Sequence, residues 1–139
     1  MTNNKNENDE SNCIFCKLIK DNPNIIYESP KTVVLLDRFP LGNGHLLVIP
    51  KIHCEVFDEC PLEYINECMD TIKVIIGFYN LKSYNLLQNN RHLQSVKHVH
   101  FHIIPDKNLK IDWETLKMGD DEYEERVREM RGRVNKKGE

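Results

Sequence analysis

The 139-residue chain lacks several features that would place it at once in a functional class. A formal net charge of −3 leaves no surplus of Lys and Arg of the kind that nucleic-acid-binding surfaces carry. No apolar run reaches the roughly 18 residues needed to cross a bilayer, and the polar, Asn-rich N-terminus is unlike a signal peptide. These absences predict no nucleic-acid partner, no membrane association, and a cytoplasmic location that extends to the nucleus.

Glycine, proline and paired cysteine are also scarce. The chain has 6 Gly and 6 Pro beside 40% hydrophobic residues, a composition typical of a globular protein. Its 5 cysteines form an odd set, unlike the framework of a disulfide-stabilised domain. The length suffices for one domain with one hydrophobic core.

The apolar patterning predicts several strands and one long helix. Residues 1–12 are polar without periodicity and are expected to form a disordered tail. Apolar residues in helical spacing predict a short helix over 13–20 and the main helix over 61–80. Strands are predicted at 25–28, 33–37, 45–49, 83–88 and 97–104. This order favours an α+β fold, an antiparallel sheet of about five strands with the long helix on one face.

The C-terminal residues carry a different pattern. From Asp120 onward, one helical face collects Tyr123, Val127, Met130 and Val134, while acidic and basic residues follow each other four positions apart on the remaining faces. This predicts an amphipathic C-terminal helix whose apolar face needs a surface to cover. The expected organisation is a tail over 1–12, a domain over 13–110 and an extension over 111–139.

Half of the 6 histidines lie in one short segment, His98-Val99-His100-Phe101-His102. Alternate residues of a strand share a face, so the three imidazoles are predicted to form a row lining a cleft. Neighbours in such a row lie roughly 6–7 Å apart, close enough for one phosphoryl-sized group to contact two of them. Since imidazole is a nucleophile, a proton carrier and a metal ligand, the row is the first candidate site.

Cys13 and Cys16 form a Cys-x2-Cys pair at the start of the predicted short helix. Thiolates at this spacing hold zinc in many proteins, and zinc then needs two further ligands, for which His53 and His98 are the obvious candidates. A redox pair and chance are open alternatives. A thioredoxin-like motif, however, expects a strand before the helix, and the polar tail does not supply one.

Taken with other motifs, the histidine segment resembles the histidine-triad (HIT) superfamily, whose pattern is His-φ-His-φ-His-φ-φ with φ apolar. The run Gly-His-Leu-Leu-Val-Ile-Pro-Lys at 44–51 is similar to the family's Gly-His-x-Leu-Val-x-Pro-Lys. Residues 13–19, 35–40, 85–90 and 94–95 also resemble family motifs. The resemblance covers residues 13–105 and implies a HIT-like fold. It points to the zinc-containing, nucleotide-binding hydrolase branch.

This resemblance also implies two sets of site residues. Zinc-bearing members complete the Cys-x2-Cys pair with the His after Pro-Lys-x and the first triad His, which implies one structural zinc per chain held by Cys13, Cys16, His53 and His98. For a purine nucleotide, Asp37 is implied at the ribose, since a carboxylate can accept from both hydroxyls. The implied base wall is Ile14, Phe15, Leu18 and Leu35, residues that serve equally as plain core. The implied phosphate contacts are Asn89, Gln94 and Ser95, with His45 close to the triad.

The activity implied is hydrolysis or transfer at the α-phosphate of purine nucleoside phosphoramidates or dinucleoside polyphosphates. His100 would attack phosphorus to form a nucleotidyl-histidine, His102 would contact the phosphate or leaving group, and AMP would be the product. The family also implies a homodimer. Two other interpretations remain open: an AMP-type binding module with little turnover and a regulatory or partner-binding role, and a zinc-organised scaffold that binds no nucleotide.

Two departures from the family pattern bear on this choice. Arg91-His92-Leu93 stands where the family loop is usually longer and rich in glycine, so backbone approach to the phosphate is expected to change. Two outcomes are open: Arg91 supplies compensating positive charge at the phosphate, or the activity is weakened. Asp106 replaces the Arg that often follows Ile-Ile-Pro, which removes any role for that Arg.

Overall fold

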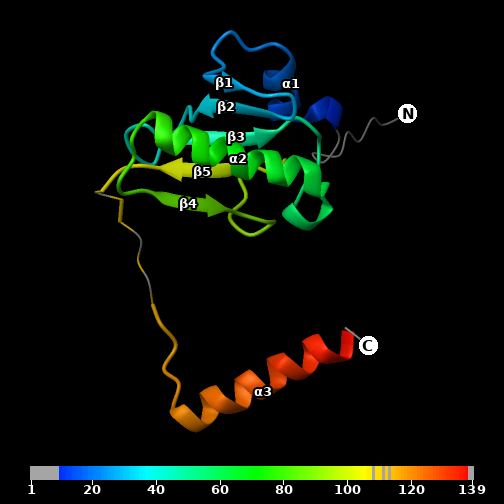
Figure 1. The fold of residues 1–139 in the computed structure, drawn as a ribbon, viewed down its shortest axis with the longest axis vertical. Helices are drawn as coiled ribbons and strands as arrows, with labels where there is room; N and C mark the ends of the chain where they lie inside the picture. Colours follow the sequence, from blue (N-terminus) through cyan, green and yellow to red (C-terminus); the bar gives the residue numbers. More distant parts are fainter. Residues whose placement is uncertain (1–9, 108, 111, 113, 138–139) are drawn as a thin grey trace. The chain divides into compact units, whose positions relative to one another are not determined.

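The computed structural model describes residues 10–107, 109–110, 112 and 114–137 (Figure 1). Contacts along the chain divide it into two units, Met1–Leu109 and Lys110–Glu139. Residues 1–9 of the predicted disordered tail lie outside the described residues. The last three residues of that predicted tail, Glu10–Asn12, instead form the 3-10 turn η1.

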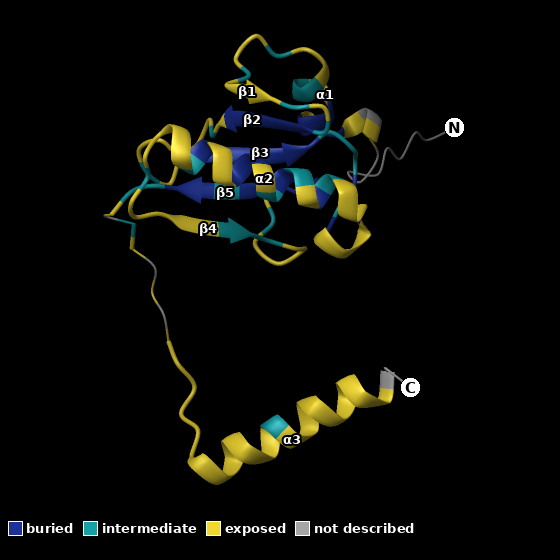
Figure 2. Ribbon diagram, viewed as in Figure 1, coloured by how far each residue is buried: buried dark blue, intermediate teal, exposed yellow. Residues whose placement is uncertain are grey.

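The first unit is built on one antiparallel sheet, which confirms the predicted α+β class. Its strands are β1 (Tyr27–Glu28), β2 (Thr32–Leu36), β3 (Leu46–Pro50), β4 (Asn85–Gln88) and β5 (Phe101–Ile104). Their spatial order is β1-β2-β3-β5-β4, with every neighbouring pair antiparallel. Buried residues gather on β2, β3 and β5, whereas the edge strands β1 and β4 are largely exposed (Figure 2).

Helix α2 covers one face of the central strands, and α1 packs on part of the other face. Helix α2 (Leu62–Phe78) crosses one face and packs with Val34, Val48, Phe101 and Ile103 in one apolar cluster. A second cluster joins Phe15 and Cys16 of α1 (Ile14–Lys20) to Val33, Leu35, Leu47 and Ile49. Because apolar residues pack on both faces of β2 and β3, these two strands are nearly continuous apolar runs. Phe101 and Ile103 face the α2 cluster, as the alternation in the sequence predicted.

Helix α2 ends where the chain adopts a left-handed conformation. Asn80 has a φ of 52°, and the backbone N–H of Leu81 donates to the Ile76 carbonyl at 3.0 Å, closing the last turn. The helix therefore ends at Phe78, two residues before the predicted boundary. The chain is then turned back toward β4.

The connection between β2 and β3 brings two polar residues together. Gly44 has a φ of +74°, a conformation that favours glycine, and a Cβ on Gly42 would lie 2.5 Å from the Asp106 Cβ. The turn closes with the Asp37 N–H donating to the His45 carbonyl at 2.9 Å. Asp37 and His45 are thereby held side by side at one end of the sheet.

The histidine strand is shorter than predicted. A strand over 97–104 was expected, but β5 begins at Phe101. The register pairs Val48 with Phe101, so the hydrogen-bonded pair two residues further on would be Pro50 with Val99, and Pro50 has no N–H to donate. The Val99 N–H instead donates to the Cys54 carbonyl at 2.9 Å. His98 and His100 therefore precede the strand and do not continue one straight row with His102.

The described residues of the second unit contain one helix, α3 (Asp120–Lys137), as predicted from its amphipathic pattern. Arg126 lies 4.0 Å from Glu122 and 3.0 Å from Glu129, and Arg133 lies 3.0 Å from Glu129. Within the described part of the chain, no helix combines the length and apolarity needed to cross a membrane.

Candidate functional site

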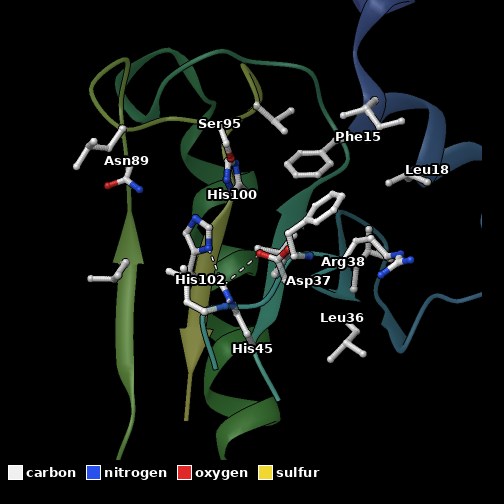
Figure 3. A pocket seen from close by; sticks show the side chains of 18 residues that line it. Phe15, Leu18, Leu36, Asp37, Arg38, His45, Asn89, Ser95, His100 and His102 are labelled. Carbon is white, nitrogen blue, oxygen red and sulfur yellow. Dashed lines mark hydrogen bonds and ion pairs between the residues drawn. The ribbon is translucent and has the colours of Figure 1, made fainter. Parts of the chain in front are cut away.

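A cavity of about 580 Å³ opens on the sheet face opposite α2, a size typical of small-molecule sites (Figure 3). Its floor follows one cross-strand row, because Leu35 pairs with Leu47, Leu47 with His102, and His102 with Leu87. Most of the site residues predicted for catalysis and nucleotide binding line it: Ile14, Phe15, Leu18, Leu35, Asp37, His45, Asn89, Ser95, His100 and His102.

His100 presents an unprotonated nitrogen to this cavity. Its Nδ1 lies 2.7 Å from the His98 carbonyl oxygen, and a carbonyl only accepts, so Nδ1 carries the proton. The lone pair of the neutral ring is consequently on Nε2. Burial lowers the pKa of His100, which keeps the ring neutral. A free, neutral imidazole nitrogen facing a cavity is a potential nucleophile.

His102 presents the opposite kind of nitrogen, because His45 determines its tautomer. The Leu41 N–H donates to His45 Nδ1 at 3.0 Å, so the proton of neutral His45 is on Nε2. That Nε2–H donates to His102 Nδ1 at 2.9 Å, which leaves the His102 proton on Nε2. Burial, followed by the neighbouring His100 and His45, lowers the pKa of His102 to about 4. His102 is therefore a neutral hydrogen-bond donor.

Asp37 is partly exposed beside this histidine pair. Its Oδ1 accepts from the Phe39 N–H at 2.9 Å, and its Oδ2 lies 3.4 Å from His45 Nε2. Burial nonetheless lowers the pKa of His45, with the nearby Asp37 carboxylate opposing that shift. The carboxylate has acceptor capacity left for a ligand at the cavity wall.

Phe15 separates the cavity from a second group of polar side chains. Its ring makes edge contacts with His100 at 5.0 Å and with His98 at 5.9 Å between centroids. It lines the cavity and belongs to the α1 core cluster at once. The two alternatives for Phe15, base wall and plain core, are thus both compatible with its position.

The second group contains the four predicted metal ligands, with ligand atoms all within 4.8 Å of one another: Cys13, Cys16, His53 and His98. His98 Nδ1 lies 3.4 Å from Cys13 Sγ, 3.5 Å from Cys16 Sγ and 3.3 Å from His53 Nδ1. Tetrahedral zinc, with bonds of about 2.3 Å to sulfur and about 2.0 Å to nitrogen, places one nitrogen roughly 3.3 Å from another nitrogen and roughly 3.5 Å from a sulfur. The spacing of the donors therefore fits one tetrahedral ion.

The orientation of His98 also suits a metal ligand. Its Nε2–H donates to the Pro50 carbonyl at 2.8 Å, so the Nδ1 lone pair faces the thiols. Burial lowers the pKa of His98 to about 4, which keeps the ring neutral. Cys13 precedes α1 and its sulfur accepts from the Cys16 N–H at 3.5 Å, so the helix turn holds both thiols on one side.

Asp37, His45 and His102 also bring three ligand atoms within 4.8 Å of one another, but their protons do not suit a metal ion. His45 Nδ1 already accepts from Leu41, so its Nε2 is protonated and offers no lone pair. A metal ion there would require an imidazolate or the loss of the Leu41 contact. The two clusters both contain two histidines, but only the cluster with the two thiols offers its imidazole lone pairs to a metal ion.

Gln94, of the predicted phosphate contacts, is not among the described residues that line the cavity. Its side-chain amide donates to the Glu55 carbonyl at 2.6 Å and accepts from the Arg91 N–H at 2.8 Å. Arg91 in turn contacts Glu59 at 3.1 Å and Glu55 at 3.8 Å. Gln94 and Arg91 thus stabilise the conformation of the shortened loop. The positive charge of Arg91, which could have compensated for the missing glycines at the phosphate, is paired with two carboxylates instead.

Several lining residues had no signal in the sequence. Leu93 reaches the cavity from the loop, at a φ of 59°, and its side chain is 77% exposed. Leu87 lines the cavity because the β4–β5 register places it opposite His102, and the sequence pattern does not predict that register. The turn after Asp37 contributes further walls, and its position between two predicted strands could have indicated them: Arg38, Phe39 and Leu41.

Comparison with known proteins gives a consistent result. Residues 20–109 match the family model described as "HIT domain". Adenosine 5'-monophosphoramidase HNT1 of Saccharomyces cerevisiae is 39% identical over 102 residues, 70% of this chain and 65% of that enzyme, so the chain spans slightly less than two thirds of its length. The enzyme of the same name in Schizosaccharomyces pombe is 34% identical over 130 residues, 88% of this chain and 98% of that enzyme.

The fold comparison agrees. The crystal structure of a histidine triad nucleotide-binding protein from Candida albicans superposes with a TM-score of 0.79 and 30% identity, covering 89% of this chain and 98% of that one. The part matched by the family model carries the histidine segment. The chain belongs to the HIT family.

Proposed function

We propose that the protein is a nucleotide hydrolase that cleaves purine nucleoside phosphoramidates at the α-phosphate and releases AMP. The observation that carries the proposal is the tautomer of His100, whose Nδ1–H is held by the His98 carbonyl so that Nε2 faces the cavity as a nucleophile. The names of the two relatives, both adenosine 5'-monophosphoramidases, support this substrate class.

The proposed reaction has two steps through an adenylyl-histidine. His100 Nε2 attacks the α-phosphorus, the phosphorus–nitrogen bond breaks with its electrons going to the amine, and the amine takes a proton from solvent. Water then attacks phosphorus, the bond to His100 breaks, AMP departs and a proton returns to solvent. The His98 carbonyl faces Nδ1–H and stabilises the positive charge that His100 carries in the adduct.

The other residues would position the substrate. The His102 Nε2–H is available to a non-bridging phosphate oxygen, and Asn89 and Ser95 line the same end of the cavity. Asp37 is proposed to accept from the ribose hydroxyls. The proposed base wall remains Ile14, Phe15, Leu18 and Leu35.

The charge of the cavity favours phosphoramidates over dinucleoside polyphosphates. Among the described residues that line it, Arg38 is the single one with a permanent positive charge. The histidines are neutral, and Arg91 is paired with Glu59. A polyphosphate leaving group carries several negative charges that this lining would not neutralise.

A substrate comparison tests the proposal. The full chain should release AMP from adenosine 5'-monophosphoramidate with a kcat/KM at least roughly tenfold above that for diadenosine triphosphate, corresponding to about 1.4 kcal/mol in the barrier. Tight AMP binding with no turnover of either compound would support the binding-module interpretation instead. Absence of AMP binding would leave only the metal-organised scaffold.

Zinc is proposed as a structural ion held by Cys13, Cys16, His53 and His98, a donor set whose spacing fits tetrahedral coordination. When bound, it would join α1 to the segments around His53 and His98 and supply folding energy. It would take no part in the reaction, because its four ligands fill the tetrahedron and Phe15 lies between it and the cavity.

A homodimer is proposed as the working form. Strand β4 is an edge strand with exposed Leu86 and is preceded by exposed Tyr84, features that suit pairing with a second copy along the sheet edge. Sedimentation at micromolar concentration should give twice the chain mass, and a monomer would contradict it.

Two further proposals concern organisation and location. Residues 13–110 would form the domain and residues 111–139 an extension, and the protein would be cytoplasmic or nuclear.

A further inference from the structure

Helix α3 has an apolar stripe that its own unit does not cover. Tyr123, Met130 and Val134 are 62%, 58% and 71% exposed, and Val127 is half-buried between them. The four residues are spaced by four, three and four positions, the alternation that places apolar side chains along one seam of a helix pair. The other faces of α3 are charged, so this seam is the feature that requires a partner.

The stripe is symmetric about its own centre. The midpoint between Tyr123 and Val134 and the midpoint between Val127 and Met130 both fall between residues 128 and 129. Two copies of α3 in antiparallel orientation would therefore place Tyr123 against Val134 and Val127 against Met130 in four layers. An isologous interface requires this kind of self-complementarity.

The charges select the same orientation. The first turns of α3 are acidic, and the last turns are basic: Asp120, Asp121, Glu122, Glu124 and Glu125 against Arg131, Arg133, Lys136 and Lys137. Antiparallel copies bring each acidic half against a basic half, whereas parallel copies bring like charges together. Across the seam, Glu124 meets Arg131 of the second copy.

The remaining flanking cations are already compensated. Arg126 and Arg133 would approach each other across the other side of the seam, which by itself is unfavourable. Both guanidinium groups, however, lie 3.0 Å from Glu129 of their own helix. Arg126 also lies 4.0 Å from Glu122, so each helix supplies two carboxylates that reduce the repulsion between the two copies.

We propose that α3 is a self-association element that pairs antiparallel with α3 of a second copy of this chain, centred between residues 128 and 129. Four apolar layers alone give a weak pair, since 18 residues span only about 27 Å. Attachment to domains that meet through another surface would raise the effective concentration of the two helices and so complete the pair. The proposal concerns assembly and does not depend on the hydrolase activity.

Cysteine cross-linking in the full chain tests the orientation, because the five native cysteines are all buried. We expect co-expressed Tyr123→Cys and Val134→Cys chains to form a mixed disulfide under mild oxidation. Tyr123→Cys alone should not link to itself, because antiparallel copies separate the two positions by roughly 16 Å along the axis. The matched control pair is Glu125→Cys with Gly132→Cys, which has the same axial register on the outer face, where a Cβ at 132 meets nothing.

Two results would overturn the pairing. One is efficient self-linking of Tyr123→Cys, which indicates parallel helices. The other is a yield for the Tyr123→Cys and Val134→Cys pair no higher than for the control pair, which indicates that the stripe covers another surface. Hydrolysis is measured on the same variants and should persist, so a failure of this pairing is distinguished from a failure of the proposed activity.

Discussion

His98 and His100 lie two residues apart and are equally buried, yet the structure prepares them for different chemistry. His98 donates from Nε2 to the Pro50 carbonyl and turns Nδ1 toward two thiols. His100 donates from Nδ1 to the His98 carbonyl and turns Nε2 toward the cavity. One backbone carbonyl per ring decides which nitrogen keeps its lone pair. Residue type alone does not show whether a histidine is a metal ligand or a nucleophile. The atom that accepts the proton of its ring does show it.

The largest expected effect is the loss of activity on substitution of His100, the histidine that faces the cavity. His100→Ala should lower kcat for AMP release by roughly 10³-fold or more, because it removes the attacking atom, while the fold and AMP binding persist. Steady-state kinetics and calorimetric titration with AMP measure this. His92→Ala, a change to an exposed loop histidine, is the matched control and should keep its rate. An adenylyl adduct trapped on any other residue would contradict the assignment.

A substitution at the proposed zinc site should mainly lower the free energy of unfolding. His98→Ala removes one proposed ligand but keeps the carbonyl that orients His100, so the metal-to-protein ratio should fall while part of the activity remains. The free energy of unfolding should drop by roughly 3 kcal/mol or more, from lost metal and a vacated core position. Metal analysis and urea unfolding, with and without a chelator, give both readouts. A variant that keeps full metal content would remove His98 from the ligand set.

The pH dependence should follow the neutral cavity histidines. Burial holds the pKa values of His100 and His102 below the ordinary 6.5, that of His102 at about 4. The nucleophile is lost on protonation, so kcat/KM should be flat above pH 6.5 and fall only in more acid solution. The unfolded chain binds these protons near pH 6.5 and the folded chain at lower pH, so stability also decreases as the pH falls below 6.5. An acid limb with its midpoint above pH 6.5 would contradict neutral rings.

His45 is expected to act through His102 as a positioning residue. His45→Ala removes the donor that holds His102 Nδ1 as an acceptor, so the His102 proton would no longer be held on Nε2. We expect kcat to fall by roughly 10–100-fold with a smaller change in KM. His45→Gln keeps an amide N–H near that position and should recover part of kcat. Equal losses in both variants, with unchanged folding, would argue against control of the tautomer.

The smallest effect is expected at the loop. Arg91 lies 3.1 Å from the exposed Glu59, and such surface ion pairs contribute about 0–1 kcal/mol. Arg91→Ala should therefore change KM by less than about threefold, as should Glu59→Ala. A large rise in KM for Arg91→Ala alone would show that this guanidinium does reach the substrate phosphate.

The sequence predicted the strands, the two main helices and most of the cavity lining, because these follow from apolar periodicity and from the HIT motifs. Its prediction of a strand over 97–104 was wrong for the first four residues, because Pro50 has no N–H for the next hydrogen-bonded pair and β5 begins at Phe101. The roles of Gln94 and Leu93 depend on a loop with positive φ at two non-glycine residues. Such a conformation arises from tertiary contacts, and no local pattern encodes it.

The role of His100 as a nucleophile already requires a backbone carbonyl to hold the proton of its second ring nitrogen, but the tautomers of the other rings could not be predicted from the sequence. They depend on which carbonyl or N–H lies at each ring nitrogen, as for Leu41 at His45. Long-range ¹H–¹⁵N correlation spectroscopy of the imidazoles at neutral pH measures them directly. The expected spectrum has the proton of His100 on Nδ1 and those of His98 and His102 on Nε2. A His100 ring protonated on Nε2 would contradict its assignment as the nucleophile, and with it the proposed distinction between the two clusters.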